Sequence, residues 1–366
     1  AYEQIPSLVL GQRWTPQLNS RNMMKVVLCV WIEPYIENDL SFCVWPVHTP
    51  TTSKEVLTLS ASTSPLPYTG NKSCIVNTIL SVMPKHTVYI DPCMGSAEVF
   101  FRKPRAEKEI LNDYNGDLVN LFRVIQNNEK LAYLLGRLYL SINGELAFKQ
   151  NKDRLKGVPN ILDDVIETSQ IFYDASWEDI QNAAAFLENQ VYSFSSTGQT
   201  FGIARRDMSQ RLPRLMSAYN RIRDAIILHR DYKDVITYAA CPGSFILLDP
   251  PYKVTEDMYS KAIEQHDILF SFMSEVNQQH HGEVKFLITY NNDPYIRGLA
   301  EKHGFDTFVQ TRLHSMKQSK EAGALYEELL IAKCDLEKQA AANHLYLDEQ
   351  KSQMTLFDFK TNYTED

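Results

Sequence analysis

Short apolar runs alternate with helical periods in the first half of the chain. Apolar runs at 88–90 and 110–111 each lead into an aspartate or asparagine, which predicts two strands that end in turns. After the second run, apolar residues recur with the i, i+3, i+4, i+7 spacing of an amphipathic helix at Leu118, Leu121, Phe122 and Ile125. This order of strand, turn and helix predicts an α/β fold with a parallel sheet.

The same pattern returns later, with predicted strands at 245–248, 284–289 and 329–332. Between the two parts the chain is acidic and helical, and then polar and rich in arginine, which predicts an inserted domain. We therefore predict an irregular N-terminal extension, a first catalytic half, a mainly helical insert, a second catalytic half and a flexible tail, at 1–64, 65–145, 146–215, 216–335 and 336–366.

The composition is typical of a globular protein, with 44% hydrophobic and 22% charged residues among 366. The longest early apolar run, 26–31, is too short to span a bilayer and lacks the layout of a signal peptide. The six cysteines form no CxxC pair and no metal-ligand spacing. We expect a cytoplasmic protein with reduced thiols, no bound metal and no membrane partner.

The net charge of −8 argues against a nucleic-acid partner, but the charge is unevenly distributed. Residues 200–233 contain seven arginines and one lysine against three aspartates, whereas 161–190 contain seven acids and no basic residue. A basic patch of this kind attracts phosphates, and arginine also binds guanine edges. A solvated charged face is the alternative reading. The candidate DNA-binding residues are Arg205, Arg206, Arg211 and Arg214.

The stretch Y-I-D-P-C-M-G-S-A, residues 89–97, places Asp91 at a predicted strand end and Gly95 in a turn that opens a helix. Small residues there let a bound cofactor approach the backbone, and helix N-terminal amides suit an anionic group. Asp113 lies 18 residues beyond Gly95, at the spacing of an acid that accepts hydrogen bonds from a ribose. A tight turn beside a capping acid is the alternative. Together these residues favour a nucleoside-bearing cofactor.

Two further motifs offer residues to the same cofactor. P-Y-T-G-N-K-S at 67–73 lacks the glycines of a phosphate-binding loop, which disfavours an NTPase. Lys72, at the start of a predicted helix, and Tyr68 are instead candidates for one wall of the site; an exposed lysine is the alternative. Asp231, after a further predicted strand, is a candidate partner for the amine of an adenine, with a solvated acid as the alternative.

The stretch F-I-L-L-D-P-P-Y, residues 245–252, is the strongest catalytic candidate. Asp249 leaves a buried strand at the sheet edge where open α/β folds bind ligands. Pro250 and Pro251 stiffen the loop and leave the Pro250 carbonyl free as an acceptor, and Tyr252 supplies a flat ring. Two acceptors and a ring suit an amino-bearing base whose nitrogen attacks a methyl group. A proline-stiffened turn is the alternative.

The order of 68–72, 91–95, 112–113, 231–232 and 249–252 resembles the Dam-like, alpha-group adenine DNA methyltransferases, over about 65–335. The resemblance implies a Rossmann-like sheet with an inserted, mainly helical target-recognition domain, and S-adenosylmethionine as cofactor. It also implies methylation of the exocyclic N6 amine of a flipped-out adenine in duplex DNA. Cofactor residues by resemblance are Tyr68, Lys72, Asp91, Gly95, Asp113, Asp231 and Asp249, and catalytic residues are Asp249, Pro250, Pro251 and Tyr252.

The chain departs from this family at Ala97, where a second glycine is usual, and at Lys253, where an aromatic or apolar residue is usual. The target sequence does not carry over. Methylation of RNA or of a protein amide is an alternative activity, and a non-catalytic nucleic-acid-binding protein of the same fold is another.

The C-terminal stretch Q-M-T-L-F resembles the pentapeptide with which bacterial proteins bind the replication sliding clamp. Gln353, Leu356 and Phe357 would make the contacts, and the alternative is that these residues fold back on the domain. We expect a monomer of bacterial or phage origin that acts on double-stranded DNA and is recruited to newly replicated DNA.

Overall fold

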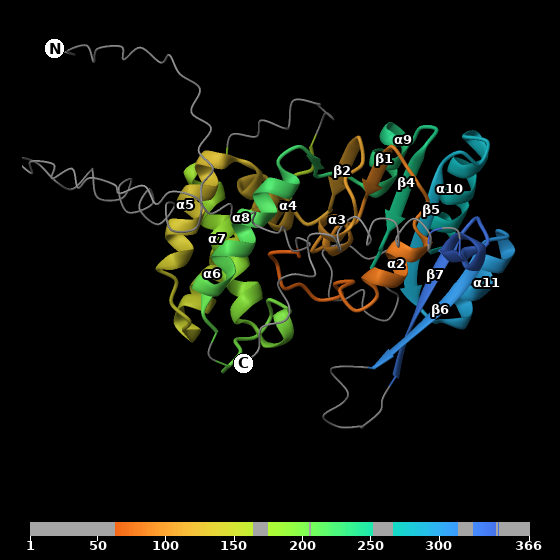
Figure 1. Cartoon of the computed structure of the whole chain (residues 1–366). Coiled ribbons are helices and arrows are strands. Elements are labelled where there is room, and N and C mark those ends of the chain that lie inside the picture. Colours follow the sequence, from red (N-terminus) through yellow and green to blue (C-terminus); the bar gives the residue numbers. More distant parts are fainter. Residues whose placement is uncertain are drawn as a thin grey trace, which may run out of the picture. The chain divides into compact units, whose positions relative to one another are not determined.

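The computed structural model describes residues 63–163, 175–204, 206–251, 266–313, 325–341 and 343. Residues 1–62 therefore lie outside it, which is all but the last two residues of the predicted N-terminal extension at 1–64. The described part is built around one seven-stranded sheet with strand order β3-β2-β1-β4-β5-β7-β6 (Figure 1). The strands are β1 (Val88–Asp91), β2 (Lys108–Asn112), β3 (Ile226–Leu228), β4 (Ser244–Leu248), β5 (Lys285–Asn291), β6 (Asp306–Leu313) and β7 (Leu325–Ala332).

The predicted α/β fold is confirmed, and its sheet is mixed, with antiparallel pairs at one edge. β1 to β5 pair in parallel, whereas β7 runs antiparallel to both β5 and β6. The predicted strands at 88–90, 110–111, 245–248, 284–289 and 329–332 are all confirmed, with small changes at their ends. The strand order reverses between β1 and β4, which is where open α/β sheets bind ligands.

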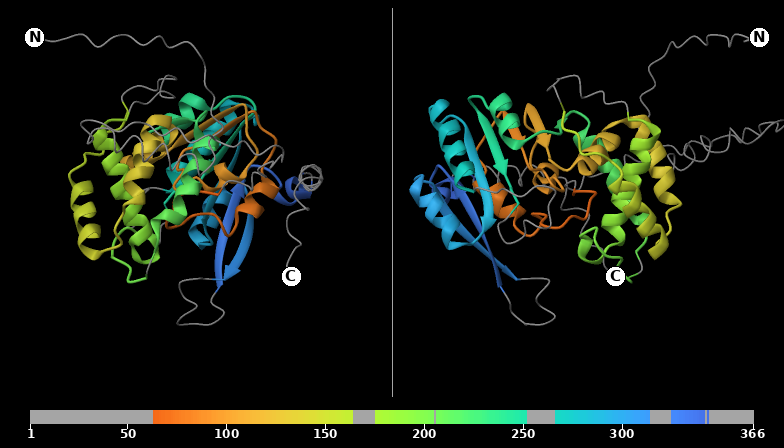
Figure 2. Two further views of the ribbon diagram at one scale, coloured as in Figure 1. Left: turned by 60° about the vertical axis from the view of Figure 1, so that its left-hand side comes forward. Right: turned by 180° about the vertical axis from the view of Figure 1, so that it is seen from behind.

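Successive side chains of a strand point to opposite faces of the sheet. In the central strands both sets are apolar, so both faces are buried. Ile90, Ile246 and Ile288 belong to one core together with apolar residues of three helices, α9 (Tyr232–Ala239), α10 (His266–Gln279) and α11 (Pro294–Lys302). Tyr89 and Phe245, one position away in β1 and β4, are equally buried and belong to the opposite face. Figure 2 shows these three helices gathered on one side of the sheet.

Helices fill the chain between β2 and β3 and pack mainly on one another. The predicted amphipathic helix near 118–125 is confirmed as α4, and α7 contacts α4, α5 and α6. Their bounds are α4 (Gly116–Gln126), α5 (Asn128–Tyr139), α6 (Glu145–Lys156), α7 (Trp177–Tyr192) and α8 (Leu212–Ile222), with short 3-10 turns η3 (Phe194–Ser196) and η4 (Met208–Arg211). None of the helices in the described ranges is long and apolar enough to cross a membrane.

Two short helices flank the first strand. α2 (Val76–Val82) begins four residues after Lys72, so Lys72 lies in the preceding turn and the prediction that it opens a helix is wrong. α3 (Glu98–Arg102) follows the turn that contains Gly95 and Ala97, and both residues have positive φ, 48° and 55°. The left-handed conformation costs alanine about 1–2 kcal/mol. Ala97 nevertheless adopts it, with its methyl group buried, so the turn forms without the second glycine.

A buried ion cluster ties α8 to the sheet. Glu109 of β2 accepts hydrogen bonds from Arg221 of α8, which also donates to the Phe100 carbonyl at 2.8 Å. Lys103, fully buried, binds the same carboxylate. Burial opposes ionisation of Glu109, but the bond from Arg221 and the charge of Lys103 outweigh it and hold its pKa below the ordinary value. The cluster therefore fixes the position at which the helical segment between β2 and β3 ends against the sheet.

Replacing Glu109 with alanine leaves two buried cations without their shared anion. We expect Glu109→Ala to lower the free energy of unfolding by about 3–5 kcal/mol, the usual cost of breaking a buried ion pair. Urea denaturation measures this loss. Asp224→Ala is the matched control, because Asp224 and its partner Arg105 are both exposed, and exposed pairs contribute about 0–1 kcal/mol. Equal losses in the two variants would contradict the assigned role.

Candidate functional site

A cavity of about 620 Å³ lies at the carboxyl ends of β1, β2 and β4. Its volume falls in the range of small-molecule sites, roughly 300–1,000 Å³. The carboxyl ends of parallel strands meet at this edge, so side chains distant in sequence are brought together. Among the predicted site residues, the cavity is lined by Tyr68, Lys72, Asp91, Gly95, Asp113, Asp231, Asp249 and Pro251.

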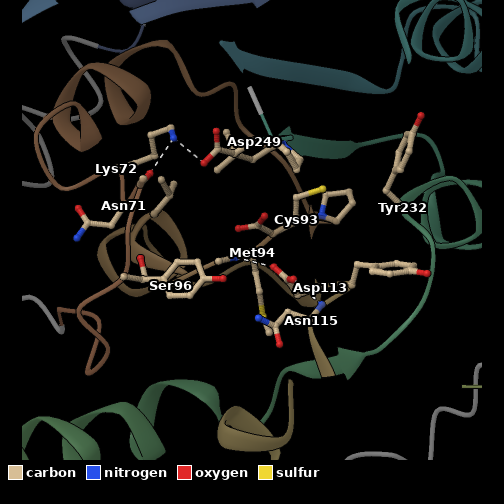
Figure 3. A pocket seen from close by; sticks show the side chains of 18 of the residues that line it. Asn71, Lys72, Cys93, Met94, Ser96, Asp113, Asn115, Tyr232 and Asp249 are labelled. Atoms are coloured by element: carbon tan, nitrogen blue, oxygen red, sulfur yellow. Dashed lines mark hydrogen bonds and ion pairs between the residues drawn. The ribbon is translucent and has the colours of Figure 1, made fainter. Parts of the chain in front are cut away.

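Asp249 follows β4 directly and is held at both carboxylate oxygens. Lys72 Nζ lies 2.6 Å from Oδ2 and also donates to the Gly70 carbonyl at 3.0 Å. Thr289 of β5 donates to Oδ1 at 2.6 Å. Figure 3 shows Lys72 and Asp249 pointing toward one another across the cavity. Burial raises the pKa of Asp249, and the charge of Lys72 and the two hydrogen bonds oppose that rise.

Asp91 ends β1 with an incomplete set of partners. The Tyr89 hydroxyl donates to Oδ2 at 3.0 Å, whereas Oδ1 is buried and accepts no hydrogen bond. Burial raises the pKa of Asp91 to about 8, the Tyr89 bond lowers it, and the charges of Asp249 and Asp113 raise it further. A buried acceptor without a donor is costly. Asp91 lines the cavity, and this oxygen has no hydrogen-bond partner among the described residues.

Asp113, just after β2, holds the turn that follows β1. Its Oδ2 accepts the Gly95 amide at 3.0 Å and its Oδ1 accepts the Asn115 amide at 2.9 Å. Burial raises its pKa to about 6, against these backbone hydrogen bonds. The Tyr114 amide also donates to this carboxylate, so three backbone amides occupy most of its acceptor capacity.

Glycine at position 95 keeps the turn close to a second wall of the cavity. A Cβ built at Gly95 would lie 3.6 Å from the Tyr68 ring, and its φ of 48° favours glycine. Asp231 caps α9 by accepting the Lys233 amide at 3.0 Å and also lines the cavity.

The cavity also contains residues that the sequence analysis did not single out. Cys93, Asn115 and Arg230 line it beside the predicted motifs, and Tyr232 packs its ring edge-on against Phe272. Cys93 and Tyr232 lie inside the motifs at 91–95 and 231–232 without a predicted role of their own, and Asn115 and Arg230 lie beside the motifs. Thr289 gave a weaker signal still, because it is one polar residue inside an apolar strand.

The helical segment contacts the cavity wall at two places. The Thr69 hydroxyl, in the turn before Lys72, donates to the Ser196 carbonyl at 3.1 Å. On the other side, Asn160 donates to the Tyr114 carbonyl at 3.0 Å and accepts the Gly116 amide at 2.8 Å. Residues between β2 and β3 thus contact two parts of the wall that the candidate cofactor-binding residues form.

The candidate DNA-binding arginines fall into different environments. Arg206 donates to the Val191 carbonyl, so part of its function is structural. Burial lowers the pKa of Arg211, and the nearby charges of Arg214 and Arg206 lower it further, which shows that the three lie close enough to interact. Arg214, near the start of α8, is exposed. Arg205 lies outside the described residues.

Other predicted residues also lie outside the described ranges. They are Tyr252 and Lys253, which follow Pro251, and the tail residues Gln353, Leu356 and Phe357. Pro250 is buried, directly after Asp249.

The chain is similar to several curated proteins at low identity. A DNA N-6-adenine-methyltransferase of Escherichia phage P1 is 24% identical over 257 residues, which cover 65% of this chain and 31% of the phage protein. Modification methylase StsI of Streptococcus sanguinis is 25% identical over 210 residues, 54% of this chain and 30% of the relative. Type II methyltransferase M1.LlaDCHI of Lactococcus lactis subsp. cremoris is 23% identical over 192 residues, which cover 50% of this chain and 64% of the relative.

This chain therefore spans less than a third of the length of the first two relatives. A family model covers a larger share of this chain than these relatives do, and it includes every motif that lines the cavity. The model of the D12 class N6 adenine-specific DNA methyltransferases matches residues 68–320, from Tyr68 through Thr289 and beyond. The chain belongs to the D12 class N6 adenine-specific DNA methyltransferase family.

Proposed function

We propose that this protein transfers a methyl group from S-adenosylmethionine to the exocyclic N6 amine of a flipped-out adenine in duplex DNA. The observation that carries the proposal is the Asp249 carboxylate, which is clamped at both oxygens on the edge of the cavity. Family membership supports the reaction type. The names of the similar proteins support adenine in DNA as the substrate.

The cavity residues fit S-adenosylmethionine as the cofactor. Its ammonium group, sulfonium, ribose hydroxyls and adenine amine present positive charge and hydrogen-bond donors, and the lining supplies acceptors. We assign Asp91, with its unpartnered oxygen, to the positively charged end. Asp113 is assigned to the ribose hydroxyls, Asp231 to the adenine amine, and Tyr68 and Gly95 to the wall that the cofactor packs against.

S-adenosylmethionine supplies an electrophilic methyl group attached to sulfur. The protein's task is to hold the target amine in line and to make its lone pair available. We assign Asp249 and the Pro250 carbonyl to accept the two N–H groups of that amine, and Tyr252, which lies outside the described residues, to stack on the base. Because burial raises the pKa of Asp249, its carboxylate is a better proton acceptor than an exposed one as the amine loses a proton.

Methylation of RNA or of a protein amide would use a similar acceptor pair. The neighbouring charges of Arg206, Arg211 and Arg214, of which Arg214 is exposed, favour a nucleic-acid substrate over a protein amide. The clamped Asp249 argues against a non-catalytic binding protein, because a binding role does not require it. Transfer of labelled methyl to duplex DNA, RNA and protein separates the activities.

Asp249→Asn replaces one acceptor with a donor and removes the charge that pairs with Lys72. We expect methyl transfer to duplex DNA to fall by at least about 100-fold, the effect of losing one preorganised electrostatic contact. DNA affinity should stay within about threefold, since the substitution leaves the arginines unchanged. Asp224→Asn is the exposed control. Activity of Asp249→Asn near that of the wild type, or wild-type transfer to RNA alone, would refute the proposal.

The arginine cluster is assigned to the DNA backbone. We expect Arg214→Ala to weaken DNA binding on all sequences alike, and to reduce the slope of log K against log salt by about 1, the signature of one lost phosphate contact. Arg223→Ala is the matched control, because Arg223 is exposed just after the same helix and pairs with Asp224. An unchanged salt slope in Arg214→Ala would remove Arg214 from the interface.

We further propose that the tail segment 353–357 docks on the replication sliding clamp, which would recruit a monomeric enzyme to new DNA in a bacterial cytoplasm. Leu356→Ala combined with Phe357→Ala should reduce capture by purified clamp at least tenfold, because apolar anchors in pockets dominate such contacts (roughly 2 kcal/mol each). Tyr363→Ala, elsewhere in the tail, is the control. Equal capture of all three proteins would contradict the docking.

A further inference from the structure

The buried hydroxyl of Thr289 lies at the catalytic edge of the sheet, and Thr289 is not among the predicted site residues. Thr289 is fully buried in β5 and donates to Asp249 Oδ1 at 2.6 Å. β5 is parallel to β4, with Leu248 opposite Ile288. Asp249 and Thr289 are the next residues along each strand, so their side chains point to the same face.

That face also carries the second contact of the carboxylate. Lys72 reaches Oδ2 from the turn before α2, while Thr289 reaches Oδ1 from the neighbouring strand. Two donors on two different oxygens fix the rotation of the carboxylate plane, which a single donor would leave free. The oxygen lone pairs that remain are those available to a substrate.

Threonine suits this position better than other hydroxyl-bearing residues. Its β-branch restricts χ1 and packs well on a pleated strand, so the hydroxyl is held in one direction. The contact is short and its donor is fully buried, which limits competition from water.

We infer that Thr289 is a positioning residue for methyl transfer, whose hydroxyl orients the Asp249 carboxylate toward the target amine. Lys72 neutralises this carboxylate, and Thr289 sets its rotation. The inference rests on the proposed function for its consequence in catalysis. The geometric part, a hydrogen bond that orients and stabilises the ionised carboxylate, does not depend on the substrate.

Two substitutions separate the hydroxyl from the shape of the side chain. Thr289→Val keeps the branched shape and removes the hydroxyl, whereas Thr289→Ser keeps the hydroxyl and removes the methyl group. We expect Thr289→Val to lower kcat about 10- to 100-fold, with the KM for DNA within about threefold, because the loss concerns preorganisation. Thr289→Ser should retain kcat within about threefold of the wild type.

The pH profile gives a second readout that packing alone would not change. A hydrogen bond donated to the ionised carboxylate lowers its pKa, so removing it raises that pKa. The acid limb of the kcat profile should therefore move to higher pH in Thr289→Val and return in Thr289→Ser. The other groups that face Asp249 are Lys72, Glu328, Asp91, Asp113 and Cys93, and all five are unchanged in both variants.

A direct titration separates this inference from the proposed activity. Infrared difference spectra of protein labelled with ¹³C-aspartate, with Asp249→Asn to assign the band, report the Asp249 carboxyl whether or not methyl is transferred. A higher midpoint in Thr289→Val supports the inference even if the wild type methylates no DNA, in which case only the proposed function fails. An unchanged midpoint, an unchanged kcat, or equal loss in Thr289→Ser would overturn it. Thermal denaturation checks that both variants are folded.

Discussion

The ion pair between Lys72 and Asp249 joins residues 177 positions apart, and the arrangement of the cavity depends on it. Asp249 lies at the carboxyl end of β4 because a buried apolar strand leads into it. At that edge it is close to Asp91 and Asp113, which end two other strands and share its charge. Lys72 is the buried cation that pairs directly with the Asp249 carboxylate. It also ties the turn at 68–72 to the sheet, which closes one wall of the cavity.

The central strands and the cofactor turn could be predicted because their signals are local. Apolar runs followed by an acid predicted β1, β2 and β4, and the cavity brings Asp91, Asp113 and Asp249 together as expected. β6 was missed because D-T-F-V-Q-T-R-L, at the edge of the sheet, contains neither a long apolar run nor a strict polar–apolar alternation. Its antiparallel pairing with β7 is a matter of chain topology, which periodicity alone does not encode.

The contacts between the site residues were harder to predict than the set of residues that line the cavity. Thr289 meets Asp249 only because β4 and β5 pair in one register, and a shift of one residue would turn the hydroxyl to the other face. Asp113 was expected to bind a ribose, but in the structure its oxygens also hold the Gly95 and Asn115 amides. Tyr252, Arg205 and the tail motif stay predictions, because they lie outside the described residues.

The carboxylates of the cavity have opposite effects on stability and on ligand binding. When ionised they lower the stability of the fold, and they favour a cationic ligand. Asp91 has a pKa of about 8 in the folded chain and near 3.8 when unperturbed, so between these values folding takes up a proton. Stability from this group thus falls as pH rises from about 4 to about 8, and the loss is complete above that range. A cationic ligand reverses the penalty by favouring the ionised carboxylate. Under the proposed function, transfer removes the sulfonium charge, so the same carboxylates hold the product less strongly than the donor.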